Sequence, residues 1–374
     1  MHKVRVKSGL FDEEDYLKDC PKGQFIPATL PAVHRIIAIG DIHGDLGLAI
    51  RSFKLARLID DDFNWIADPP NTVVVQVGDQ VDSCRPTDDK QCHTTYYEGD
   101  KPNDLKVLDF FEDIGHKAQQ QGGAVYSLLG NHELMNAQGR FGYVSFMNWQ
   151  HFHYTDPDTQ QVYEGPAGRR EAFKPGGPLA KRLGCGRPTV LVIGSTMFVH
   201  AGLLPVLAER LDYIGFDSNV KLHYLNALVR KWLLHKLGSD SNDLEAKRMV
   251  IDAPSSSSTT ISPFWTRIFG QIPAGSNIND GKCADAVKKT LEVYKIGKLV
   301  VGHTPQLFTH NAGINGTCYM VDSSNPTLFR VDAGFAEAFS SFGKPHPIQV
   351  LEIIDDRQFN ILTEGVHPVL VWWC

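Results

Sequence analysis

The stretch RIIAIGDIHGD, residues 35–45, contains a short apolar run that leads into acidic residues and a histidine. Its first part, Arg35–Ile39, is rich in isoleucine, which is typical of a strand buried on both faces of a sheet. Gly40 ends the run, and Asp41 and His43 follow it. In an open α/β sheet, ligands bind at the carboxyl ends of the strands. This stretch therefore predicts both a buried strand and a site at its end.

The same arrangement recurs four times further along the chain. Short apolar runs precede Asp, Asn or His side chains that could bind a metal: VVVQVG before Asp79 and Asp82, VYSLLG before Asn131 and His132, MFV before His200, and KLVVG before His303. A single Asp or His after a strand is usually an ordinary turn residue. Five such strand ends in one predicted domain, however, imply a shared polar site.

Helical patterns alternate with these apolar runs. Apolar residues recur every three or four positions over 45–59, 104–119 and 225–237, which predicts three amphipathic helices. Further strands are expected at 190–193 and 348–354. Strands that alternate with helices favour an α/β fold in which helices cover the sheet.

The chain divides into few parts. Residues 1–30 are mixed and polar and are interpreted as an N-terminal extension, followed by one catalytic domain over 31–374. Within that domain, residues 137–190 are aromatic and polar, and we interpret them as an inserted cap folded over it. The run SSSSTT at 255–260 predicts a loop, and VLVWW at 369–373 predicts a final strand.

The composition excludes several classes of protein. Hydrophobic residues make up 42% of the 374 residues and charged residues 21%, as in ordinary globular proteins. The net charge of −6 argues against a nucleic-acid partner, because such binding relies on surplus cations. The most apolar stretch, residues 190–204, is shorter than the roughly 20 residues of a membrane-spanning helix. No apolar signal core opens the sequence, so we expect a cytoplasmic protein without membrane contact.

The cysteines favour the same compartment. Seven are present, an odd number at low density, and none forms a Cys-x-x-Cys motif. Reduced thiols are therefore expected rather than a disulfide framework, with Cys84 and Cys92 as the one pair close enough in sequence to bond locally.

The strand ends offer a ligand set for metal ions. It contains carboxylate, amide and imidazole groups and no cysteine: Asp41, His43, Asp79, Asn131, His200 and His303. Such a mixture suits Mn²⁺, Fe²⁺ or Zn²⁺ better than Ca²⁺. Six ligands are too many for one ion that must also bind a substrate. Two ions about 3.5–4 Å apart that share one carboxylate fit the number.

At this point the sequence resembles a known family. Its motifs are similar, in the same order, to those of the phosphoprotein phosphatase (PPP) family of calcineurin-like metallophosphoesterases: GDIHGD (40–45), GDQVD (78–82), GNHE (130–133), VHAG (199–202) and VGHT (301–304). Within that family, further motifs resemble the Shewanella-like phosphatase branch: LLGNHELMN (128–136), EAFKPGGPLA (171–180), FVHAGLLP (198–205) and PFWTR (263–267). The resemblance implies a central β-sandwich flanked by helices.

The resemblance also implies which residues bind the metals. Asp41 and His43 would hold the first ion, and Asp79 would bridge both. The second ion would be held by the remaining three ligands, Asn131, His200 and His303. Mn²⁺ is the foremost expectation for both ions, with Fe and Zn as alternatives.

Further roles follow for residues around the reacting phosphate. His132 would be the general acid, and Asp82 would orient it and stabilise its charge. Arg267 and Asn131 would bind the phosphoryl group.

One position departs from the family pattern. Ser83 stands where the family has a phosphate-binding arginine. Arg85 is the first candidate to replace it, and Arg169 or Arg170 in the insertion are the alternatives.

These observations predict a metal-dependent phosphoprotein phosphatase that hydrolyses phosphate monoesters by direct attack of a hydroxide bridging two metals. Its partner would be a phosphoprotein or phosphopeptide with phosphoserine, phosphothreonine or phosphotyrosine. Two alternatives stay open: a nucleotide or dinucleoside polyphosphate hydrolase with the same site, and a decayed phosphatase that only binds phosphoproteins.

Overall fold

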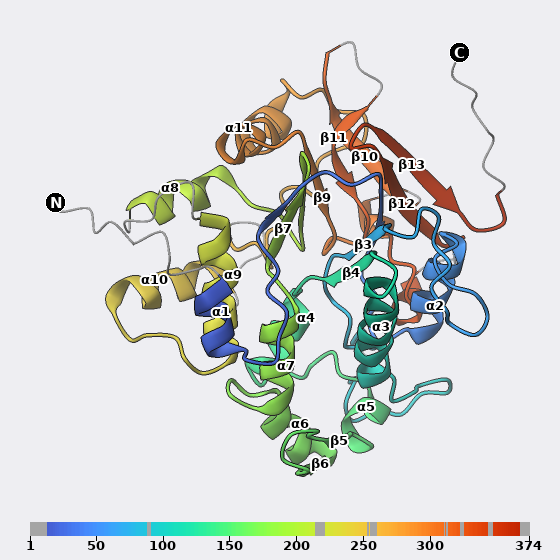
Figure 1. Cartoon of the computed structure of the whole chain (residues 1–374), viewed down its shortest axis with the longest axis vertical. Coiled ribbons are helices and arrows are strands. Elements are labelled where there is room, and N and C mark those ends of the chain that lie inside the picture. Colours follow the sequence, from blue (N-terminus) through green and yellow to red (C-terminus); the bar gives the residue numbers. More distant parts are fainter. Residues whose placement is uncertain are drawn as a thin grey trace.

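The computed structural model describes residues 13–87, 91–213, 221–252, 254, 260–309, 311, 313–321, 325–342 and 347–366. Two sheets pack face to face, and helices cover the outer face of each (Figure 1). The fold is therefore the helix-flanked β-sandwich that the resemblance predicts.

One sheet contains the strands that lead into the first three motifs. Its order is β13 (Gln358–Thr363), β12 (Gln349–Ile354), β2 (Arg35–Ile39), β3 (Val73–Gln76) and β4 (Ala124–Ser127). Strands β2, β3 and β4 are parallel, so their carboxyl ends lie at one edge. Helices α2 (Leu46–Leu55) and α3 (Asp104–Gln119) pack on its outer face through residues such as Phe53 and Phe111.

The other sheet contains the strands before His200 and His303. Its order is β1 (Thr29–Leu30), β7 (Val190–Ile193), β8 (Thr196–Val199), β9 (Lys298–Val301), β11 (Pro326–Arg330) and β10 (Asn315–Tyr319). The helical elements beside it are α7 (Pro178–Gly186), α8 (Pro205–Tyr213), α9 (Lys221–Leu233), the π-helix η1 (Cys283–Lys288) and α11 (Lys289–Tyr294).

The space between the sheets is filled by aliphatic and aromatic side chains. Val75 and Leu351 from one sheet meet Phe198 and Val300 from the other, and all four are completely buried. Each central strand thus has two buried faces, which explains why its sequence is a continuous apolar run rather than an alternating one.

The remaining elements surround this sandwich. The predicted cap begins in α4 (Asn131–Ala137) and contains α5 (Phe146–Gln150), the hairpin β5 (His153–Thr155) and β6 (Val162–Glu164), α6 (Gly165–Phe173) and α7. The others are α1 (Glu13–Asp19), α10 (Ser241–Val250) and the 3-10 helices η2 (Gln306–Thr309) and η3 (Glu337–Phe342).

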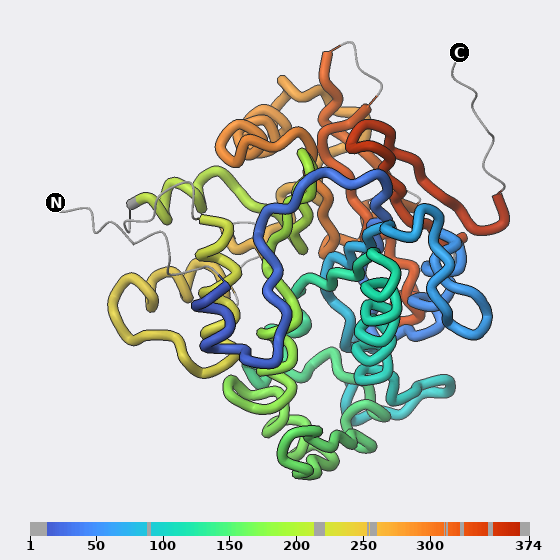
Figure 2. The backbone as a smooth tube through the Cα atoms, in the orientation of Figure 1, coloured from blue at the N-terminus to red at the C-terminus, as the bar shows by residue number. Residues whose placement is uncertain are grey.

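The described part of the predicted N-terminal extension, residues 13–30, runs across the molecule from α1 to β1 (Figure 2). Strand β1 pairs in parallel with β7. Asp15 and Asp19 form ion pairs with Arg230 on α9.

The expectation of reduced thiols is wrong for six cysteines. Disulfides join Cys20 to Cys185, Cys84 to Cys92, and Cys283 to Cys318. Two of these pairs are 165 and 35 residues apart in sequence, so only the folded chain brings them together. Disulfides are typical of oxidising compartments, and the cysteines therefore no longer support a cytoplasmic location.

Some predictions concern parts of the chain that the structure does not describe, and others are confirmed. The predicted final strand at 369–373 lies outside the described residues, as does most of the predicted loop, 255–259. No helix in the described ranges is long and apolar enough to cross a membrane. The helix predicted at 104–119 has these same bounds in α3.

Candidate metal centre

The carboxylate of Asp79 lies at the centre of the predicted site. Its Oδ2 atom is 3.3 Å from Nε2 of His200, 3.8 Å from Nε2 of His132 and 4.0 Å from Nε2 of His43. Two ligand atoms that share an ion each lie about 2.1 Å from it, and hence roughly 3–3.5 Å from each other. The 3.3 Å separation between Asp79 and His200 suits two atoms that share a cation, whereas the gaps to His132 and His43 are longer.

The amide oxygen of Asn131 forms a second meeting point. It lies 2.9 Å from Nε2 of His200 and 2.8 Å from Nδ1 of His303. The backbone N–H of His303 donates to the carboxylate of Asp41 at 3.1 Å, and Nε2 of His43 is 3.9 Å from the same carboxylate. The structure thus brings together all six predicted ligands.

Three of the histidines are oriented by backbone carbonyls outside the cluster. Nδ1 of His200 lies 2.8 Å from the carbonyl of Val77, and Nε2 of His303 lies 3.2 Å from that of Trp265. Nδ1 of His43 makes a longer contact of 3.4 Å with a carbonyl. A carbonyl only accepts, so each ring carries its proton on the outer nitrogen and leaves the inner nitrogen free to bind a metal.

The backbone around the site is constrained to hold these side chains. A Cβ atom added at Gly130 would lie 2.2 Å from the carboxylate of Asp79. A Cβ atom added at Gly302 would lie 2.3 Å from the carboxylate of Asp41. Only glycine allows such close approach. Asp79 and His303 have φ angles of 56° and 66°, a strained region for residues with side chains that is typical of functional sites.

Buried carboxylates crowd the site and suit cations. Burial, then the charges of Asp332 and Asp79, raise the pKa of Asp41 well above its usual range. Burial raises the pKa of Asp332 to about 6. Burial also opposes ionisation of Asp79, but His200 and His132 outweigh it and hold its pKa well below the usual value. Divalent cations would relieve the repulsion among these carboxylates.

With this geometry established, comparison with known families is decisive. A sequence model described as calcineurin-like phosphoesterase matches residues 34–307, more than half of the chain. The chain belongs to the calcineurin-like phosphoesterase family.

Individual relatives refine the placement of this phosphoesterase. It is 56% identical over 254 residues to uncharacterized protein R398 of Acanthamoeba polyphaga mimivirus, covering 68% of this chain and 98% of the viral protein. It is 29% identical over 389 residues to Shewanella-like protein phosphatase 2 of Arabidopsis thaliana, covering 96% of this chain and 84% of the plant protein.

A solved structure has a similar fold. The cold-active protein-tyrosine phosphatase of a psychrophilic Shewanella species matches with a TM-score of 0.58 at 18% identity, covering 91% of this chain and 83% of that one. This likeness shows that the two chains share a fold. The plant sequence relative supports the predicted resemblance to the Shewanella-like branch.

The predicted general acid lies beside the metal ligands of this phosphoesterase. Nδ1 of His132 is 2.8 Å from the carboxylate of Asp82, and its Nε2 faces Asp79. Arg169 is completely buried behind them and donates to both Asp82 and Asp104. Arg169 is thus part of the support for His132, and does not replace the missing phosphate-binding arginine.

Of the other arginines, two have charges close to the site. Arg85 donates hydrogen bonds to the backbone carbonyls of Asp82 and Cys84. Burial is the main cause of the lowered pKa of His43, and the charge of Arg85 is the second. Arg267 likewise lowers the pKa of His303, again second to burial. Arg170 instead stacks 4.7 Å from the ring of Trp149.

Two residues of the phosphoesterase site were missed from the sequence. Asp332 follows β11 just as the ligands follow their strands, and its Oδ2 has no hydrogen-bond partner among the described residues. The strand-end pattern would have revealed it had β11 been predicted. Glu133 accepts hydrogen bonds from the backbone N–H groups of Asp79, Gln80 and Gly130, and so fixes the loop that carries the central ligand.

The predicted cap contributes little to the site itself. Tyr143 lies edge-on to His132 with 5.0 Å between ring centres. Phe141 and Trp149 instead pack together in a small cluster of their own. Most aromatic side chains of this segment therefore serve packing.

Proposed function

We propose that this chain is a metal-dependent phosphoprotein phosphatase that hydrolyses phosphate monoesters of serine, threonine or tyrosine side chains. The observation that carries this proposal is the convergence of the six predicted ligand side chains, Asp79 and Asn131 among them, with His132 facing the same space. The names of the plant protein phosphatase and the bacterial protein-tyrosine phosphatase support a phosphoprotein as the substrate.

The ligand set defines how two cations would be held. The ligand atoms of His200 and His303 form one group with Asp79, and that of His43 forms another with the same carboxylate. Asp41 lies 3.9 Å from His43, and Asn131 contacts His200 and His303. When bound, two divalent ions would neutralise the phosphate dianion and lower the pKa of a water between them towards neutrality.

The histidine–aspartate pair would assist departure of the alcohol. The Asp82 carboxylate accepts the Nδ1–H of His132, fixes the ring and stabilises its positive charge. Nε2 then faces the site and would donate its proton to the leaving oxygen. General-acid catalysis of this kind contributes roughly 10²–10⁴-fold to the rate.

Three side chains would hold the phosphate oxygens. Arg85 and Arg267 supply positive charge from opposite parts of the chain. The amide nitrogen of Asn131 donates only to the sulfur of Met135, at 3.8 Å, among the described residues, so its second N–H group remains available.

The proposal is tested by hydrolysis of p-nitrophenyl phosphate with added Mn²⁺. We expect turnover by the wild-type protein and none by Asp79→Asn, because this carboxylate faces both halves of the ligand set. Asp113→Asn, an exposed change on α3, is the matched control and should retain full activity. Equal activity in Asp79→Asn and the wild type would contradict the proposal.

The two alternatives are separated by further measurements. Faster hydrolysis of a dinucleoside tetraphosphate than of phosphopeptides would favour the nucleotide hydrolase. Binding of phosphopeptides without any turnover, with two metals present, would favour the decayed phosphatase.

A further inference from the structure

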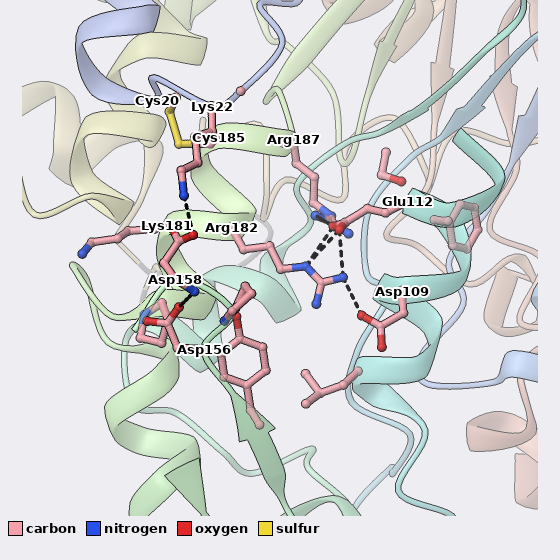
Figure 3. A pocket seen from close by; sticks show the side chains of 18 of the residues that line it. Cys20, Lys22, Asp109, Glu112, Asp156, Asp158, Lys181, Arg182, Cys185 and Arg187 are labelled. Atoms are coloured by element: carbon pink, nitrogen blue, oxygen red, sulfur yellow. Dashed lines mark hydrogen bonds and ion pairs between the residues drawn. A yellow bond between two sulfur atoms is a disulfide. The ribbon is translucent and has the colours of Figure 1, made fainter. Parts of the chain in front are cut away.

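A large groove lies away from the ligand cluster, between α3, α7, the β5–β6 hairpin and the N-terminal segment. Its volume is about 1570 Å³. The Cys20–Cys185 disulfide ties the N-terminal segment to α7 at one side of the groove (Figure 3). Arg182 of α7 reaches across the groove to Asp109 and Glu112 of α3. The groove thus has walls held by covalent and ionic links.

The free edge of a sheet lies in this groove. Strand β4 is the last strand of its sheet, and Val125, Tyr126 and Ser127 line the groove. The backbone N–H groups of Ala124 and Leu128 donate to β3 or the residue before it. Because alternate residues of a strand point their hydrogen-bonding groups to opposite sides, those of Val125 and Ser127 point away from β3.

The outward N–H groups make no hydrogen bond to the residues that the structure describes. Neither the N–H of Val125 nor that of Ser127 makes a hydrogen bond within the described ranges of the chain. An edge strand with unpaired groups is a template for another extended segment. Partly buried apolar side chains, among them Ile26 and Tyr154, line the same groove and offer contacts for alternate residues of such a segment.

The charge of the groove is opposite to that of the whole protein. Its lining carries eight Lys and Arg residues but five Asp and Glu, whereas the chain as a whole has a net charge of −6. Arg182, Arg187 and Lys22 are paired with acidic neighbours. Lys106 and Lys181 are exposed and have no ion-pair partner among the residues described.

We propose that the edge of β4 in this groove docks an extended, acidic segment of the phosphoprotein substrate as an added strand. Backbone hydrogen bonds to Val125 and Ser127 would align the segment, and Lys106 and Lys181 would select acidic side chains. The identity of the segment as substrate rests on the proposed phosphatase function. The docking itself is independent of turnover.

Binding is measured with fluorescein-labelled phosphorylated β-casein, an acidic and unfolded phosphoprotein, by fluorescence anisotropy. The protein carries Asp79→Asn so that the probe is not consumed. We expect Lys106→Glu/Lys181→Glu to raise the Kd about tenfold. The control Lys282→Glu/Lys295→Glu changes the net charge equally at exposed positions outside the groove, and should stay within about twofold of the parent.

Hydrogen–deuterium exchange then tests the strand itself. Casein should slow exchange of the amides of Val125 and Ser127. Equal weakening in both double variants, absence of casein binding, or unchanged exchange at these two amides would each overturn the docking proposal.

A measurement of turnover separates this proposal from the one before it. In the active protein, Lys106→Glu/Lys181→Glu should lower kcat/KM for casein and leave that for p-nitrophenyl phosphate unchanged. A parallel loss on both substrates would count against docking. If the wild type binds casein at β4 but hydrolyses neither substrate, the phosphatase function fails while docking stands.

Discussion

At the scale of single residues, the hydrogen bonds of the histidines separate their roles. The rings of His200 and His303 are oriented by neutral carbonyls, which leaves the inner nitrogen of each ring facing the predicted metal site. His132 is instead oriented by the carboxylate of Asp82, which stabilises a protonated ring. A histidine that binds a metal needs one unprotonated ring nitrogen, whereas a general acid must be protonated, so the partner on the far side of each ring distinguishes the two proposed roles.

This difference predicts how His132→Asn behaves with different substrates. Phenolate is a poor leaving group and needs a proton, whereas p-nitrophenolate departs without much help. We expect kcat to fall roughly 10²-fold or more for phenyl phosphate but much less for p-nitrophenyl phosphate. Steady-state kinetics with both substrates provide the measurement, and an equal loss on both would argue against the acid role.

A second residue-scale prediction concerns the position where the family arginine is absent. If Arg85 binds phosphate, Arg85→Ala removes a charge-assisted hydrogen bond worth about 1.5–3 kcal/mol. The inhibition constant for inorganic phosphate should then rise about tenfold or more. Adding Ser83→Arg to this variant is the control, since it restores an arginine at the family position. An unchanged inhibition constant in Arg85→Ala would exclude this role.

At the scale of elements, sequence reasoning worked where the information is local. The central strands are apolar runs because both of their faces are buried, and their ends therefore marked side chains that the structure brings together. Helices α6 and α7 were not predicted, because their turns interrupt the apolar periodicity with Gly and Pro. The disulfide partners were also missed, since pairing across 165 residues leaves no mark on local spacing.

The link between α3 and α7 leads to a prediction of pH dependence. Burial alone would raise the pKa of Glu112, but Arg187 and Arg182 outweigh it and lower the pKa below the usual 4.5. A carboxyl group with a lowered pKa stabilises the fold above its unfolded pKa, and this contribution is lost as the pH falls through the folded value.

Glu112→Gln should therefore lower the Tm by about 1 °C at pH 7. The difference from the wild type should shrink below pH 4.5, as the wild-type carboxyl becomes protonated too. Asp113→Asn on the same helix is exposed and should have no such effect. Differential scanning fluorimetry over this pH range measures both, and a difference that grows in acid would contradict the assignment.

At the scale of the whole molecule, the disulfides hold together segments that are distant in sequence. Cys20–Cys185 closes a loop of 165 residues and fixes the N-terminal segment on α7. Cross-links of this kind typically stabilise a fold by about 2–4 kcal/mol. The double variant Cys20→Ser/Cys185→Ser should lose about this much free energy of unfolding in urea. With the disulfides reduced by dithiothreitol, the difference from the wild type should vanish, and its persistence would contradict this account.

The whole molecule also explains why the site is assembled from such distant parts. Strands of both sheets end near one another. Predicted ligands from distant parts of the chain, such as Asp41 and His303, therefore lie side by side at these strand ends. The sequence allowed these ligands to be predicted because each follows a recognisable strand. The sequence did not reveal that Arg169 contacts Asp82, because this contact depends on how the insertion packs against the rest of the domain.

Anomalous diffraction from crystals grown with Mn²⁺ is the most direct test of this dinuclear arrangement. Two peaks about 3.5–4 Å apart are expected, on either side of the Asp79 carboxylate and within bonding distance of the six ligands. A single peak, or peaks away from Asp79, would contradict the central claim.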